Sequence, residues 1–142
     1  MADAFYVVDT SVLARETVPA VRDRLRPLIE SGLLAIAATT RLELGYSARS
    51  ATDWSTTRCR LGAFAALDVT AGDMRRAAEV QDLLIARGQH RGPGVAGLLL
   101  AAAAERADLC VLHTTGTSRP SPRSPNSERR GWFRPDRWRR RR

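Results

Sequence analysis

The sequence has no lysine, and its two cysteines are isolated from each other. All 23 basic residues are arginine, which we attribute to the coding bias of a GC-rich genome because no fold requires it. Cys59 and Cys110 lie far apart and lack the short spacing of a zinc site or a redox motif. Unpaired cysteines are typical of a reducing compartment, so we expect the protein in the cytoplasm.

Long apolar runs and a basic leader are missing as well. The longest apolar candidate, from Gly92 to Ala104, is shorter than the roughly 18 residues of a membrane-spanning helix, and Glu105 ends it. The N-terminus starts with an acidic residue, Asp3, and enters its first apolar run without a basic stretch. We therefore expect neither a secretory leader nor a membrane partner. The 142 residues, 44% of them hydrophobic, are sufficient for one domain with a core.

The net charge of +8 comes entirely from the end of the chain. Residues 1–113 contain equal numbers of arginines and acidic residues, whereas residues 114–142 contain 10 arginines against Glu128 and Asp136. The same final segment is rich in arginine, proline and serine, with tryptophans between the arginines. An argument for nucleic-acid binding from charge therefore concerns this tail alone.

Apolar runs with the spacing of strands alternate with runs that have the spacing of helices. Short β-branched or apolar runs predict strands at 5–9, 33–38, 67–69 and 109–112. Helices are predicted at 18–29, 53–66, 70–87 and 94–106, with further helices capped by Thr10 or Ser11 and by Thr39 or Thr40. This alternation indicates an α/β fold, in which helices flank a parallel sheet over residues 1–113. No periodicity continues after His113, and we expect residues 114–142 to be disordered.

Two acidic residues stand where a parallel sheet places its ligands. Asp9 directly follows the first predicted strand, at the carboxyl edge of the sheet. Glu43 lies within an apolar helical stretch. Taken singly, Asp9 could be only a turn or cap residue and Glu43 part of a solvated helix face. The two histidines, His90 and His113, have no partner at the sequence spacing of a triad or a metal site, and we expect them at the surface and at a strand end.

Residues 7–13 read Val-Val-Asp-Thr-Ser-Val-Leu, and residues 40–49 read Thr-Arg-Leu-Glu-Leu-Gly-Tyr-Ser-Ala-Arg. The order of these short motifs resembles that of PIN-domain ribonucleases of the VapC type, the toxins of toxin–antitoxin pairs. Residues 7–13 resemble the opening of that family. Residues 40–49 are similar to the segment that carries its second acidic residue. The motifs at 67–70, 76–81 and 87–91 are similar to its middle part. The resemblance extends from about Phe5 to His113.

The resemblance implies a cluster of three or four carboxylates that binds Mg²⁺ or Mn²⁺ and hydrolyses RNA. Hard divalent ions take oxygen ligands, and a metal-bound water can attack a phosphodiester. Asp9 and Glu43 match the first two acidic positions, and Thr10 and Ser11 would support them, Ser11 as a hydrogen-bond donor beside Asp9. Crowded carboxylates in such a site should have raised pKa values. The family also implies a cognate antitoxin, an RNA substrate and a homodimer.

Two of the expected acidic positions are lost. Gly97 stands in Gly94-Val95-Ala96-Gly97-Leu98-Leu99, where the family has its third carboxylate. The fourth acid is expected after the last predicted strand, where this chain reads Leu112-His113 and then Thr-Thr-Gly-Thr-Ser. Reading the possible codons of this segment one base earlier permits Tyr-Asp-Arg-Asp-Phe, which resembles the family. We therefore hypothesise a single-base insertion or deletion near His113, which would also remove the last strand of the sheet.

Three readings of function follow from these departures. The chain could be a metal-dependent endoribonuclease toxin that retains some activity. It could be an inactive PIN-like protein that still binds antitoxin or RNA, or the product of a degraded gene. The Arg-rich tail at 114–142 has a separate alternative to the frameshift: arginines with interleaved Trp132, Phe133 and Trp138 could stack on bases and bind phosphates.

Overall fold

The computed structural model describes residues 4–114 and 132–133. Its sheet has five strands in the order β3-β2-β1-β4-β5, of which the first four are parallel. The four parallel strands are β1 (Tyr6–Val8), β2 (Leu34–Ala37), β3 (Ala65–Leu67) and β4 (Cys110–Leu112). The fifth, β5 (Trp132–Phe133), pairs antiparallel with β4. The predicted α/β fold, with helices flanking a parallel sheet, is therefore confirmed.

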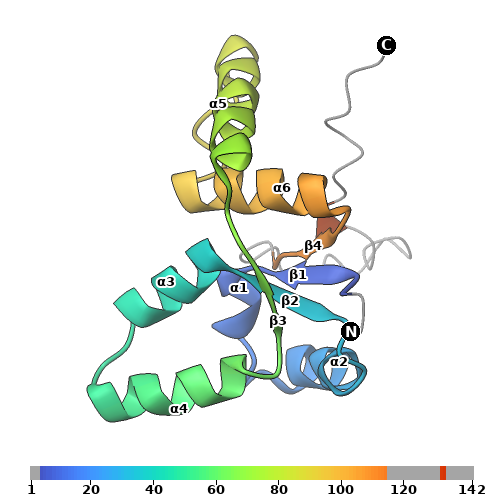
Figure 1. Ribbon diagram of the computed structural model, residues 1–142, viewed down its shortest axis with the longest axis vertical. Coiled ribbons are helices and arrows are strands. Elements are labelled where there is room, and N and C mark those ends of the chain that lie inside the picture. Colours follow the sequence, from blue (N-terminus) through green and yellow to red (C-terminus); the bar gives the residue numbers. More distant parts are fainter. Residues whose placement is uncertain (1–3, 115–131, 134–142) are drawn as a thin grey trace, which may run out of the picture.

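The helices cover both faces of this sheet (Figure 1). In chain order they are α1 (Thr10–Leu13), α2 (Pro19–Glu30), α3 (Ala38–Tyr46), α4 (Ala51–Leu61), α5 (Ala71–Ala86) and α6 (Val95–Ala107). Within the described ranges, none of these helices is long and apolar enough to cross a bilayer. The helices between successive parallel strands carry the chain back to the end of the sheet where the strands begin, as parallel pairing requires.

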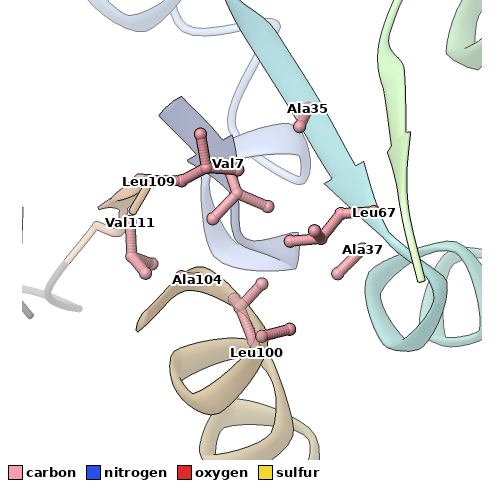
Figure 2. Packing of buried hydrophobic residues seen from close by; sticks show 9 residues of the cluster. Val7, Ala35, Ala37, Leu67, Leu100, Ala104, Leu109 and Val111 are labelled. Carbon is pink, nitrogen blue, oxygen red and sulfur yellow. The ribbon is translucent and has the colours of Figure 1, made fainter. Parts of the chain in front are cut away.

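Side chains alternate between two cores because successive strand residues point to opposite faces. Val7, Ala35 and Val111 face α6, where Leu100 and Ala104 pack against them, and Figure 2 shows this layer. Val8 and Ile36 face the other way, toward a cluster built from α1, α2 and α4. The core is therefore a three-layer arrangement, and both sides of β1 are buried.

Helix α5 packs against α6 through a third apolar cluster and through ion pairs at one end. Arg106 of α6 bonds the buried carboxylate of Asp73, with Nε 2.9 Å from Oδ1, and donates to the carbonyl of Asp68. Thr70 caps α5: its hydroxyl accepts from the Asp73 amide while the Asp73 carboxylate accepts from the Thr70 amide. These contacts fix the start of α5 on the end of α6.

Several boundaries differ from the prediction. The third strand lies at Ala65–Leu67 instead of 67–69. Asp9 caps α1 in place of Thr10 or Ser11. Helix α3 begins at Ala38, with Ala37 as its cap residue. Thr40 is therefore not the cap; it is buried within α3, and its hydroxyl donates to the Val8 carbonyl. These are local differences, and the order of elements is unchanged.

The prediction of a missing last strand needs correction. Residues 132–133 form a short strand against β4, so the sheet edge is covered over two residues rather than left fully open. Thr114 donates to Ser11, and the domain boundary placed at His113 stays a prediction. The predicted disorder of the tail, its frameshift origin and its binding of nucleic acid concern 115–131 and 134–142, which lie outside the described residues.

Candidate active site at the carboxyl edge of the sheet

Parallel pairing brings the ends of β1, β2 and β4 to one edge. Val8 pairs with Ile36 on one side and with Leu112 on the other. The residues that follow these strands therefore meet there: Asp9 after β1, the first turns of α3 after β2, and His113 after β4. The position that the sequence predicted for ligands is the position where these polar side chains gather.

Thr10 connects the two predicted acidic residues. Its hydroxyl donates to the carboxylate of Glu43, with 2.5 Å between Thr10 Oγ1 and Glu43 Oε2. Thr10 adjoins Asp9 in sequence, so Asp9 and Glu43 lie on the same edge. All three residues are half-buried. The structure therefore brings together Asp9, Thr10 and Glu43, as the sequence predicted.

Ser11 and His113 both contact the carboxylate of Asp9. Ser11 Oγ lies 2.6 Å from Asp9 Oδ2, which fulfils the prediction that Ser11 donates a hydrogen bond beside Asp9. His113 Nδ1 lies 2.9 Å from the same oxygen and 3.2 Å from Ser11 Oγ. His113 directly follows β4, so it lies at a strand end as expected. Its sequence spacing gave no partner for it, whereas the structure joins it to Asp9, 104 positions away. The signal was available: two neighbouring parallel strands each end in a polar residue.

These donors stabilise Asp9 as a carboxylate. Burial alone would raise the pKa of Asp9, but hydrogen bonds from the Ser11 hydroxyl, from His113 and from the Ser11 amide outweigh it and lower the pKa. The expectation of a raised pKa from crowded carboxylates is therefore wrong for Asp9. The nearest groups are hydrogen-bond donors, and not further acids.

Gly97 lies near the same edge but contributes no functional group. Helix α6 leads into β4 through a short turn, so it runs antiparallel to the strands and its first residues lie at their carboxyl ends. Gly97 precedes Leu100 and Ala104 by three and seven residues and therefore shares their sheet-facing side of α6. A Cβ atom added at Gly97 would meet only the Pro93 Cβ, at 4.0 Å. The space around this Cβ position is therefore open, and Gly97 itself supplies no carboxylate.

At the carboxyl edge the described residues offer two acidic side chains, Asp9 and Glu43, to a hard divalent ion. Across residues 4–114 and 132–133, no group of three or more histidine, cysteine, aspartate or glutamate side chains could hold a metal ion. One oxygen of Asp9 already accepts from three donors, and Glu43 accepts from Thr10. Mg²⁺ is usually bound by one or two carboxylates and keeps several waters, so Asp9 and Glu43 are the residues that would hold it.

Known ribonucleases are similar to this chain in sequence. Ribonuclease VapC51 of Mycobacterium tuberculosis is 47% identical over 108 residues, which are 76% of this chain and 78% of that protein. Ribonuclease VapC21 of the same species is 40% identical over 109 residues, 76% of this chain and 79% of that protein. This chain belongs to the VapC family of ribonucleases. No family model matches it.

Solved VapC-containing complexes share the fold. The chain from the VapBC2 structure of Rickettsia felis, bound to a promoter DNA fragment, has a TM-score of 0.66 and 19% identity, covering 78% of this chain and 86% of that one. The DNA-bound VapBC of Salmonella typhimurium gives a TM-score of 0.64 at 17% identity, covering 75% and 83%. The helix-flanked parallel sheet of this VapC homologue is thus the architecture found in those complexes.

Proposed function

We propose that this chain is the toxin-type member of a toxin–antitoxin pair that still binds a cognate antitoxin but has lost metal-dependent hydrolysis of RNA. The observation that carries this proposal is the carboxyl edge itself. Asp9 and Glu43 are retained there, Gly97 stands at the third acidic position, and His113 contacts Asp9. The proposal places the protein in the cytoplasm as a homodimer.

Simple electrostatics explains why two carboxylates alone should not hydrolyse RNA. Phosphodiester cleavage builds negative charge on phosphate oxygens, which a bound cation or a cationic side chain must neutralise. Asp9 and Glu43 instead add negative charge near the phosphate and repel it. In this proposal Asp9 and Glu43 are remnants of a catalytic centre, and any RNA binding would come from the arginines of residues 114–142.

Antitoxin binding has support of a different kind. The solved neighbours are VapBC complexes and a toxin–antitoxin complex of Klebsiella pneumoniae. In this chain Leu42 and Tyr46, one helical turn apart on α3, are 67% and 94% exposed. Large apolar side chains exposed together are typical of a surface that a protein partner covers. Antitoxin binding needs such a surface and does not need the missing acids.

The second candidate is an active endoribonuclease that uses Mg²⁺ or Mn²⁺. It is favoured by the retained link from Asp9 through Thr10 to Glu43, and by relatives named ribonucleases that are 40–47% identical. In this case Asp9 and Glu43 would hold the ion, which supplies the activated water and the neutralising charge.

A cleavage assay separates the two candidates. Purified full-length protein is incubated with RNA and Mg²⁺ or Mn²⁺, beside Asp9→Ala and Glu43→Gln variants. We expect no cleavage that depends on Asp9. We expect a stable complex when the chain is co-expressed with its cognate antitoxin, which we predict is encoded directly upstream. Cleavage that Asp9→Ala abolishes would establish the second candidate. If neither cleavage nor a complex is found, the protein is the product of a degraded gene.

A further inference from the structure

Several hydrogen bonds join the chain segments that follow β1 and β4. The Asp9 amide donates to the Leu112 carbonyl at 3.0 Å. Thr114 donates twice to Ser11: its amide to Ser11 Oγ at 3.2 Å, and its hydroxyl to the Ser11 carbonyl at 3.1 Å. His113 lies between these contacts, so its ring is held against Asp9 by the backbone on both sides.

The direction of the bond between His113 and Asp9 follows from its partners. Asp9 Oδ2 accepts hydrogen bonds from both the amide and the hydroxyl of Ser11, so it acts as an acceptor in this contact. His113 Nδ1 must therefore carry the hydrogen. Asp9 Oδ2 then accepts from three donors: the Ser11 amide at 3.2 Å, the Ser11 hydroxyl at 2.6 Å and His113 Nδ1 at 2.9 Å.

This arrangement is not a nucleophilic triad, although it contains serine, histidine and aspartate. In a triad the aspartate and the serine bind opposite nitrogens of the imidazole, so that one nitrogen is oriented and the other removes the proton. Here Asp9 Oδ2 and Ser11 Oγ both contact the same nitrogen, Nδ1 of His113. Ser11 also gives its own hydrogen to Asp9, and so has no base to activate it.

We propose that His113 occupies, on Asp9, the place that a divalent ion would otherwise take. A cation and an N–H group compete for the same carboxylate oxygen, because each presents positive charge to it and two positive ends repel each other at that distance. Ser11 reinforces the exclusion by donating to the same oxygen. This inference deepens the proposed function, since it names the group that satisfies Asp9 in place of an ion.

The exposure of His113 makes the proposal testable by substitution. Its side chain is 45% exposed, so truncation leaves a space that water or a hydrated ion can enter. His113→Ala removes the donor. His113→Asn keeps an N–H donor on a shorter planar side chain, and His90→Ala, in an exposed turn after α5, is a matched control for the loss of a histidine.

The experiment measures Mn²⁺ binding to the purified full-length chain without RNA, from the electron paramagnetic resonance signal of free Mn²⁺. We expect His113→Ala to lower the Mn²⁺ dissociation constant about ten-fold relative to the wild-type protein, a change of about 1.4 kcal/mol. His113→Asn and His90→Ala should bind as the wild type does. Adding Asp9→Asn to His113→Ala should abolish the gain.

Two results would overturn the proposal. Unchanged Mn²⁺ affinity in a folded His113→Ala protein, checked by circular dichroism, would mean that the imidazole does not compete with the ion. Weaker binding would mean that His113 is itself a ligand. Because binding is measured without RNA, this outcome is independent of the cleavage assay: an active wild-type enzyme would refute the proposed function and leave the ratio of affinities unaffected.

Discussion

Replacing Gly97 with aspartate tests directly whether the missing third carboxylate limits the site. Gly97 is the third residue of α6, a helix whose first turn contains no acidic residue and whose cap residue, Gly94, offers no side chain. The added side chain meets only Pro93 Cβ, at 4.0 Å. Aspartate also costs a few tenths of a kcal/mol less than glycine within a helix, and in the first turn its charge contributes about 0.3–1 kcal/mol. We therefore expect Gly97→Asp to fold.

The larger effect should appear when Mn²⁺ is added. With three carboxylates at the edge, a dissociation constant near 0.1 mM would give about 2.7 kcal/mol of stabilisation at roughly 10 mM Mn²⁺, whereas a constant near 10 mM would give about 0.4 kcal/mol. The difference of about 2.3 kcal/mol corresponds to a rise in Tm of about 7–12 °C for a domain of this size. Such a shift is much larger than the error of a melting experiment.

The assay is thermal unfolding with and without Mn²⁺, with Gly97→Asn as the control. Asparagine matches the shape of aspartate and lacks its charge, so the two variants separate the carboxylate from the loss of glycine. We expect Mn²⁺ to raise the Tm of Gly97→Asp by about 7–12 °C more than that of Gly97→Asn. Equal shifts in both variants would mean that a carboxylate at position 97 does not join Asp9 and Glu43 in binding the ion, and would contradict the reason proposed for a loss of activity.

Three further predictions concern the fold and the gene. Thr70→Ala should lower the free energy of unfolding by about 1 kcal/mol in urea denaturation, and Thr70→Ser should retain it, because the hydroxyl caps α5. Burial alone would raise the pKa of Asp73, but hydrogen bonds from Arg106 and Thr70 lower it overall. The contribution of Asp73 to stability should therefore be lost as the pH falls below about 4. Asp73→Asn should reduce the fall in the free energy of unfolding at acid pH. Sequencing the gene should reveal a homologous reading one base away after His113, and an intact frame without one would contradict the frameshift.

Much of the fold was predictable because its signals are local. The apolar runs of β1, β2 and β4 are buried on both faces and stand out in the sequence, and Thr70 and Gly88 mark the ends of α5. The third strand was misplaced because its first two residues, Ala65 and Ala66, are small and exposed, and so give little signal.

The candidate site was predicted only in part. Asp9 and Glu43 were identified from motifs, and the structure places them at one edge. The contact between His113 and Asp9 was missed because it depends on the pairing of Val8 with Leu112, which no local pattern encodes. Once the neighbouring strands are known, the pairing of the residues that follow them can be inferred from the register alone.

The close packing of α6 restricts which of its residues can face the carboxyl edge of the sheet. Ala103 and Ala104 are fully buried against the sheet, where no side chain larger than a methyl group is accommodated without displacing the helix. Helix α6 therefore cannot rotate to bring another residue to the position of Gly97. A third acid at this edge would therefore have to come from a substitution at position 97 itself or from a different segment of the chain.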